Sequence, residues 1–314
     1  MIDRFGADAL RFNIITGNSP GNDMRFYVER CEAMRNFANK LWNASRFVMM
    51  NLSIEDTALP EKLELPDKWV LSKYNTLVKE VRDNLDRYEL GIAAQKIYDF
   101  IWDTYCDWYI ELTKERLNSG DAEAREGAER VLLYVLTGIL KLLHPFMPFI
   151  TEEIFQAIPH EGEALIVAPY PKYDEALSFP EDEAGFERVM EVIRAVRSRR
   201  AEMNVPPSRK AKLIVCALDQ DTYLAGAKYL TRLASASEVE VRGIAGAGSD
   251  EEESAEGMVT VTVSMPIGSK VEQAAAMAER VAAIAEETIP ELASYYLSLI
   301  HISEPTRRTP ISYA

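Results

Sequence analysis

The chain has 314 residues, of which 47% are hydrophobic and 27% charged, and its formal net charge is −15. These values are typical of a soluble protein with more than one core. No segment reaches the roughly 18 consecutive apolar residues of a membrane span, and the N-terminus is not a signal peptide. The three cysteines are widely spaced, which argues against a disulfide framework or a zinc site. We therefore expect a cytoplasmic protein that contacts no membrane and holds no metal.

Residues 29–160 have the periodicity of long helices joined by short connections. In the first helix, apolar residues at helical spacing predict a core face made of Met34, Ala38, Leu41 and Val48. Asp67 is the expected N-cap of a second helix, and Thr151 that of a fifth. A third helix over 89–117 is aromatic on several sides, and a fourth ends at Pro145. Short connections between long helices favour an antiparallel bundle.

After residue 160 the pattern changes to that of a small α/β module. We expect an edge segment at 163–171 and a basic helix over 183–203. Strands are predicted at 211–218 and on both sides of an acidic, glycine-rich loop at 243–257, with a helix over 221–234. Residues 270–293 return to a helical pattern. The predicted fold class is thus mainly α: an antiparallel helical bundle followed by a small α/β module and a C-terminal helix.

The last eighteen residues, "LSLIHISEPTRRTPISYA" (297–314), fit neither part. They resemble the translation of a sequencing adapter, and a natural flexible tail is the alternative. We leave them out of the fold prediction.

Catalytic motifs are absent from the sequence. There is no GxGxxG or GxxxxGK[ST] phosphate-binding loop and no GxSxG nucleophile turn. Cys106 and His144 could form a nucleophilic pair, but Cys106 lies in an aromatic helix, where a core cysteine is the better interpretation. The expectation is that this chain contains neither catalytic residues nor metal ligands.

One polar stretch, "RNFANKLWNASRF" (35–47), stands out inside the first helix. Asparagine offers a hydrogen-bond donor and an acceptor together, and arginine binds phosphate and stacks on bases. Unpaired RNA bases are held by this combination of edge contacts and stacking. Three asparagines cost the helix about 2 kcal/mol relative to alanine. The alternative is a solvent-facing helix with incidental polar residues, and chemistry alone does not decide between the two.

Charge is unevenly distributed along the chain. Acidic residues gather at 174–187 and 249–256, whereas 188–212 is basic. A local positive face on an acidic protein is compatible with nucleic-acid binding.

Several segments resemble the valyl-tRNA synthetases. The likeness begins with "GADALRFNIITGNSPGNDMRF" (6–26), a segment that follows the KMSKS loop in that family. It continues through "RNFANKLWNASRF", "FIWDTYCDWYIELTK" (100–114) and "LKLLHPFMPFITEEIF" (140–155), in order and at family spacing. A further match, "RAVRSRRAEMNVPPSRKAKLIV" (194–215), follows the bundle, and the likeness covers roughly residues 1–242.

This resemblance implies the tRNA anticodon-binding portion of a valine–tRNA ligase, whose parent attaches valine to tRNA(Val) with ATP and magnesium. The catalytic and editing domains of the parent would be missing, and the fragment alone would be an inactive monomer without a cofactor, with tRNA(Val) and those domains as its partners. The implied domains are a stem-contact and junction segment (1–28), an anticodon-binding bundle (29–160), a basic helix with the α/β module (161–268), a helix that starts a tRNA-binding coiled-coil arm (269–296) and the adapter-like tail (297–314). The arm assignment departs from the family, because the leucine and lysine density expected there is missing.

Two groups of site residues follow from the family's pattern. The helix that faces the anticodon in this family contributes Arg35, Asn36, Asn39, Lys40, Trp42, Asn43 and Arg46. The basic helix contributes the phosphate-contact candidates Arg194, Arg197, Arg199 and Arg200.

Other residues have supporting roles in this prediction. We expect Trp102, Trp108 and Tyr109 in the core, Asp107 and Glu111 orienting the basic residues, and Asp8 and Arg11 bracing the junction to the missing catalytic domain. Alternatives are the same region of an isoleucyl- or leucyl-tRNA synthetase, a helical module that binds a protein, and a degradation product without binding activity.

Overall fold

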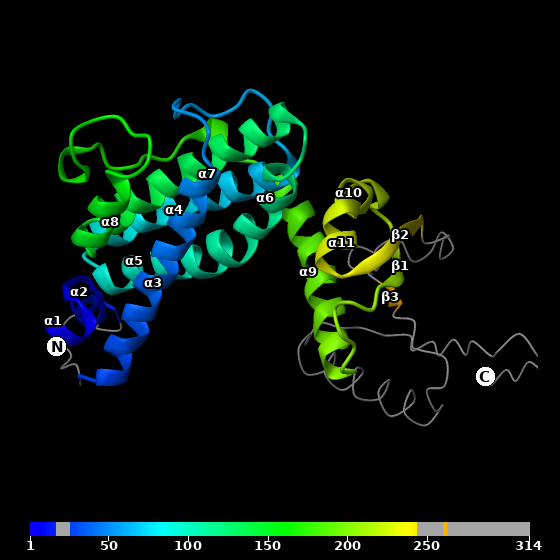
Figure 1. Ribbon diagram of the computed structural model, residues 1–314, viewed down its shortest axis with the longest axis horizontal. Helices are drawn as coiled ribbons and strands as arrows, with labels where there is room; N and C mark the ends of the chain where they lie inside the picture. The colour runs from blue at the N-terminus through cyan, green and yellow to red at the C-terminus, as the bar shows by residue number, and fades with distance from the viewer. Residues whose placement is uncertain (17–25, 244–259, 263–314) are drawn as a thin grey trace, which may run out of the picture. The chain divides into compact units, whose positions relative to one another are not determined.

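The computed structural model describes residues 1–16, 26–243 and 260–262, and most of them are helical (Figure 1). The α-helices are α1 (Ile2–Phe5), α2 (Ala7–Ile15), α3 (Val28–Asn51), α4 (Leu65–Asp86), α5 (Leu90–Asp99), α6 (Ile110–Leu117), α7 (Ala122–Leu143), α8 (Pro148–Phe155), α9 (Pro180–Glu202), α10 (Gln220–Ala225) and α11 (Ala227–Leu233). Between α5 and α6 the chain forms a π-helix, η1 (Phe100–Tyr109), and two short 3-10 helices follow α8, η2 (Leu165–Val167) and η3 (Glu175–Leu177). The predicted mainly helical fold is confirmed.

The beginnings of the bundle helices follow local capping chemistry. Asp121 caps α7, because its side chain accepts hydrogen bonds from the backbone N–H groups of Glu123 and Ala124. At α4 the N-cap is Glu64, and Asp67 stands three residues inside the helix in a capping box. The prediction of Asp67 as N-cap was therefore wrong by one turn. That of Thr151 was also wrong, because α8 begins at Pro148 and the Thr151 hydroxyl donates to the Met147 carbonyl.

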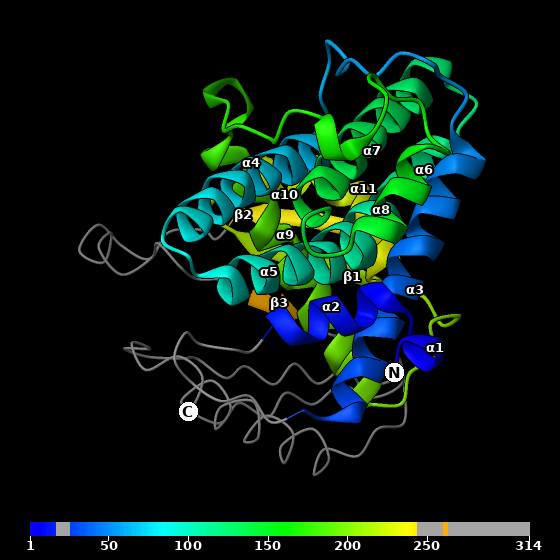
Figure 2. The same ribbon diagram turned by 90° about the vertical axis from the view of Figure 1, so that its left-hand side faces the viewer.

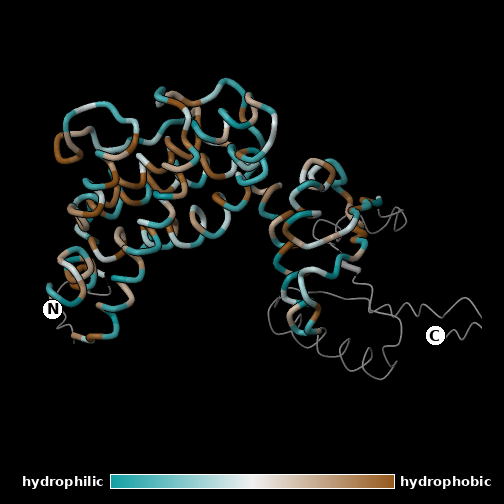
Figure 3. Tube along the Cα trace, in the orientation of Figure 1, coloured by the Kyte–Doolittle hydropathy of each residue, from teal (hydrophilic) through white to brown (hydrophobic). Residues whose placement is uncertain are grey.

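The core of the bundle centres on α7, which is buried on nearly every side over its second half. Its fully buried residues include Val131, Leu133, Leu136, Ile139 and Leu143. Apolar and polar stretches alternate along the bundle helices (Figure 3), as expected for helices with one buried face. Gly138 of α7 lets α4 approach closely: a Cβ atom there would lie 2.1 Å from the Tyr74 hydroxyl oxygen.

α3 lies at the side of the bundle, with α1 and α2 beside its N-terminal half (Figures 1 and 2). Phe5, Ala9 and Cys31 form a small buried cluster there. Asp8 accepts hydrogen bonds from the backbone N–H groups of Phe149 and Ile150 at the start of α8. Arg11 donates to the carbonyls of Pro145 and Phe146. These two residues thus hold the connection between α7 and α8. The sequence had predicted a different role for them, that of bracing the junction to the missing catalytic domain.

The described chain divides into two compact units. Of the described residues, one unit comprises 1–16, 26–198 and 221–234, and the other comprises 199–220, 235–243 and 260–262. The second unit contains the sheet, in which β1 (Ala211–Ala217) lies between β2 (Ala236–Gly243) and β3 (Thr260–Thr262). β1 pairs in parallel with β2 and antiparallel with β3.

Other predictions for the second half had mixed outcomes. The expected edge segment at 163–171 was wrong, because residues 165–167 form the 3-10 helix η2. The helix predicted over 221–234 is present as the pair α10 and α11. The loop at 243–257, the helix at 269–296 and the tail at 297–314 lie almost wholly outside the described residues. The domain boundaries stay predictions.

Candidate nucleic-acid interface on α3

Three asparagines and an arginine form an exposed stripe on α3. Asn36, Asn39, Asn43 and Arg46 follow each other at intervals of three and four residues, and all four are exposed; we call them the amide stripe. They share one helix face because such intervals return to the same side of an α-helix. In the part of the chain that the structure describes, none of these side chains makes a hydrogen bond or ion pair. Their donors and acceptors are therefore available to a ligand.

The opposite face of α3 holds the helix on the bundle. Cys31, Phe37, Leu41 and Val48 are completely buried there. The predicted core face was partly right: Leu41 and Val48 are buried, whereas Met34 and Ala38 are only half-buried. Burial of this face fixes the rotation of α3, and with it the outward direction of the amide stripe.

The other predicted residues of α3 flank the stripe and are half-buried. Arg35 makes an ion pair of 3.1 Å with Glu32. The Lys40 ammonium lies 2.7 Å from the Asp107 carboxylate, so the expected orienting role of Asp107 toward a basic residue is seen in the structure. Glu111 pairs with Lys114, which was not a predicted site residue. Trp42 is half-buried, and its contact with RNA stays a prediction.

The aromatic residues of η1 differ from the prediction. Tyr109 is fully buried, as expected, but Trp102 and Trp108 are only half-buried, and their assignment to the core was wrong. The Lys40 ammonium lies 3.7 Å from the centroid of the Trp102 ring system. The guanidinium groups of Arg194 and Arg197 lie 4.9 and 5.6 Å from the centroid of the Trp108 ring system. Cations over aromatic rings are weakly attractive, so each indole holds basic groups near the surface.

The four arginines predicted on α9 fall into two pairs. Arg194 and Arg197 are exposed beside Trp108, and the Arg197 Nε also donates to the Leu233 carbonyl at 2.7 Å. Arg199 pairs with Glu202 at 2.8 Å, and Arg200 donates to the carbonyls of Pro206 and Arg209. Their phosphate contacts stay predictions, and the first pair is the better candidate because its guanidinium groups face no carboxylate in these contacts.

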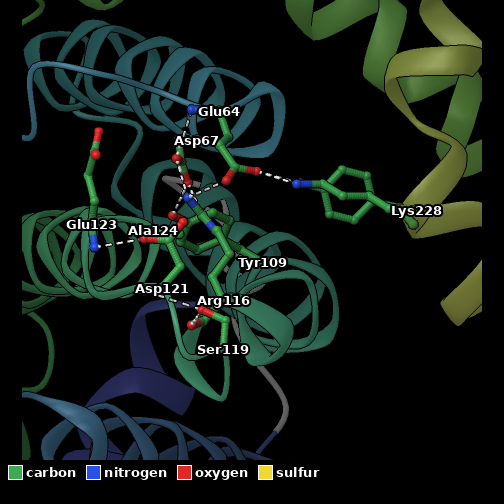
Figure 4. A network of polar contacts seen from close by, with 10 residues as sticks. Glu64, Asp67, Tyr109, Arg116, Ser119, Asp121, Glu123, Ala124 and Lys228 are labelled. Atoms are coloured by element: carbon green, nitrogen blue, oxygen red, sulfur yellow. Dashed lines mark hydrogen bonds and ion pairs between the residues drawn. The ribbon is translucent and has the colours of Figure 1, made fainter.

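A buried polar network stabilises the helix ends behind η1 (Figure 4). The Arg116 guanidinium binds both carboxylate oxygens of Asp67, at 2.7 and 2.5 Å, and the Tyr109 hydroxyl donates to Asp67 at 2.7 Å. Glu64 accepts from Lys228 of α11 at 2.6 Å. Burial is the main reason that the pKa of the Tyr109 hydroxyl is raised well above its usual value. Tyr109 thus remains a neutral donor, and the network ties η1 to the start of α4.

The sequence did not point to Arg116 as the centre of this network. It lies in "TKERL", a stretch that looks like an ordinary charged helix end. No signal in the sequence separates it from its exposed neighbours, because its burial depends on the long-range contact with Asp67.

Cys106 and His144 do not form a nucleophilic pair, because no hydrogen bond joins the two side chains among the described residues. Burial raises the pKa of the Cys106 thiol to about 12, so the thiolate is scarce near neutral pH. The His144 Nδ1 atom lies 2.8 Å from the Thr151 hydroxyl oxygen. Among the described residues, no group of three or more potential metal ligands comes together. None of the helices in those same ranges is long and apolar enough to span a membrane.

Known protein families match a large part of the chain, and the family match begins after α3. Residues 67–215 match a family described as the anticodon-binding domain of tRNA ligase. The chain is 53% identical over 247 residues to the valine–tRNA ligase of Clostridium tetani, and 50% identical over 222 residues to that of Carboxydothermus hydrogenoformans. These alignments cover 76% and 70% of the chain but only 28% and 25% of the two relatives.

A solved structure also resembles the chain. A leucyl-tRNA synthetase of Agrobacterium radiobacter, in a ternary complex with tRNA, matches with a TM-score of 0.46 and 18% identity. The match covers 57% of this chain and 21% of that one.

Proposed function

We propose that this chain, which carries the anticodon-binding domain of the valyl-tRNA synthetase family, binds the anticodon loop of tRNA(Val) through the amide stripe on α3. The observation that carries the proposal is the exposure of Asn36, Asn39, Asn43 and Arg46 on one face with their polar groups unengaged among the described residues. Amide groups can pair with the edges of unstacked bases, and a guanidinium can bind the adjoining phosphate.

The remaining steps of the ligase reaction belong, in this proposal, to parts of the enzyme that the chain does not span. The chain covers little more than a quarter of its relatives. Activation of valine with ATP and magnesium, and its transfer to tRNA, are assigned to those other parts. The chain alone is then expected to bind tRNA and to catalyse no ATP–pyrophosphate exchange.

The test compares single substitutions in the stripe on two RNA ligands. Binding of the 314-residue chain to a tRNA(Val) transcript, and to the same transcript with its anticodon replaced, is measured by fluorescence anisotropy. Asn39→Ala and Asn43→Ala are expected to weaken binding of tRNA(Val) by about fivefold or more, the lower end of a lost base-edge contact. Binding of the replaced transcript should change much less.

A matched control is available on another helix of the bundle. Gln95 is an exposed amide on α5, and Gln95→Ala should leave both affinities unchanged. An equal loss of affinity for both transcripts would show that the stripe binds RNA without regard to sequence, and would refute base recognition. Failure of the unmodified chain to bind either transcript would favour a helical module that binds a protein.

A further inference from the structure

Trp102 ends a row of four aromatic rings that starts in the core. Phe12 of α2 stacks on Phe37 of α3 at 5.4 Å between centroids, and Phe37 meets Tyr98 at 4.6 Å. Tyr98 stacks on Trp102 at 5.6 Å with an angle of 13° between the rings. Phe12 and Phe37 are fully buried, whereas Trp102 is half-buried. The row therefore leads from the interior to the surface and holds the Trp102 indole in a defined orientation.

A cation occupies the position over Trp102. The Lys40 ammonium lies 3.7 Å from the ring centroid and 2.7 Å from the Asp107 carboxylate. The Lys40 side chain is 23% exposed and that of Asp107 is 52% exposed. Ion pairs at such exposure are weak, because water screens them and ordering a long side chain costs entropy. Lys40 can therefore leave the ring at little cost when another group competes for it.

The position of Lys40 in α3 links this indole to the amide stripe. Lys40 follows Asn39 directly and precedes Asn43 by three residues, so its backbone lies within the length of the stripe on α3. Along the helix axis, Lys40 is offset from Asn39 by about 1.5 Å and from Asn43 by about 4.5 Å. The cation over Trp102 therefore comes from the same stretch of α3 as the amide stripe.

We propose that Trp102 is a stacking position for one unpaired RNA base, and that Lys40, held by Asp107, covers the indole until the base arrives. This inference rests on the proposed function and deepens it. The base replaces the ammonium on the ring, and Lys40 turns toward a phosphate. Stacking tolerates any base because every base has a π-face, so Trp102 supplies affinity while the amide stripe supplies selectivity. Lys40 and Asp107 are positioning residues in this arrangement.

The first experiment removes the aromatic surface and then restores it. The ligand is a synthetic anticodon stem-loop RNA of tRNA(Val), and its dissociation constant is measured for the full chain and for Trp102→Leu and Trp102→Phe. We expect Trp102→Leu to weaken binding by about fivefold or more, and Trp102→Phe to retain most of the affinity. Thermal unfolding of each variant reports any loss of folding.

Changes in the RNA distinguish a lost stacking contact from a folding defect in the protein. Each loop nucleotide in turn is made abasic, which removes its base but keeps its phosphate. At one position the abasic change should weaken binding to the unmodified chain and have little further effect on Trp102→Leu, because the stacking contact is already absent. Losses that multiply at every position would overturn the proposal.

The second experiment leaves the core untouched. Asp107→Asn releases Lys40 and should tighten RNA binding by about two- to fivefold, the range of a weak surface ion pair. Asp103→Asn removes the same charge from an exposed position of the same π-helix without releasing Lys40, and is the matched control. Equal effects of the two substitutions would refute the covering role of Lys40.

The outcomes separate this inference from the proposed function. If the unmodified chain does not bind the stem-loop, or binds it without dependence on Asn39 and Asn43, the proposed function fails. If binding depends on the stripe but is the same with leucine at position 102, only the stacking inference fails.

Discussion

The close contact of Gly138 with Tyr74 is the point where a single added methyl group should disturb the bundle most. A Cβ atom there would overlap the Tyr74 ring, whereas a Cβ at Gly127 of the same helix would meet nothing within 4 Å. Gly138→Ala is expected to lower the free energy of unfolding by about 1–3 kcal/mol through overpacking. Gly127→Ala should raise it by about 0.4–1 kcal/mol, because alanine restricts the unfolded chain and favours helix.

Urea unfolding of both variants measures the difference directly. The substitution is chemically identical in the two cases and lies in one helix, so a difference in sign can come only from the surroundings. Destabilisation of similar size at both positions would contradict the packing of α4 on α7 at Gly138.

The exposure of some side chains could be predicted from the sequence, and that of others could not. The outward face of Asn36, Asn39 and Asn43 was predictable, because helical periodicity fixes which residues share a face. The half-exposure of Trp102 was not, because a large aromatic residue in an apolar helix is usually core. Its exposure follows from the position of η1 in the bundle, and no local pattern in "FIWDTYCDWY" encodes that position.

The helices were predicted well where the hydrophobic periodicity is strong. α3, α4 and α7 were expected within a few residues of their observed bounds because each has an apolar face, although the predicted N-cap of α4 was wrong. The π-helix η1 was not anticipated within the helix expected over 89–117. The aromatic residues around that helix indicated that other elements pack on several of its sides. They do not distinguish the i→i+4 hydrogen bonds of an α-helix from the i→i+5 bonds of a π-helix. π-Helical turns are frequent at functional sites, and η1 carries both half-buried tryptophans.

The start of α4 should respond to acid through Glu64. Burial alone would raise the pKa of this carboxyl, but hydrogen bonds and charges from Lys228 and Arg116 hold it below its ordinary value of 4.5. A depressed pKa means that the carboxylate stabilises the fold above pH 4.5, and that this contribution is lost as the pH falls through the folded-state value. Glu64→Gln should therefore cost about 0.5–1 kcal/mol near neutral pH and progressively less below pH 4.5.

Urea unfolding of the unmodified chain and of Glu64→Gln, repeated from pH 7 to pH 3, gives this difference at each pH. Glu61→Gln, at an exposed carboxylate in the loop before α4, is the control for removal of a negative charge. A stability difference for Glu64→Gln that does not vary with pH would show that the ion pair with Lys228 contributes nothing.

The net charge of −15 is unusual for a protein proposed to bind RNA, and the distribution of charge explains how the two can coexist. In the proposed function, the amide stripe reads bases mainly through neutral groups, which need no strong positive field. The proposal assigns the phosphate contacts to a few arginines, of which Arg194 and Arg197 are the best candidates because both lie over the Trp108 ring. Repulsion from the rest of the chain also lowers affinity for RNA in general, so a larger share of the binding energy comes from the specific contacts.

This view predicts how binding depends on salt. Each phosphate neutralised by the chain contributes about −0.7 to the slope of log K against log salt concentration for a single strand. Arg194→Gln should make the slope for tRNA(Val) shallower by about that amount. Arg199→Gln removes the same charge from the same helix, but Arg199 is already paired with Glu202, so its effect should be clearly smaller. Equal changes for the two variants would mean that overall charge, and not an oriented arginine at Trp108, determines the electrostatic part of binding.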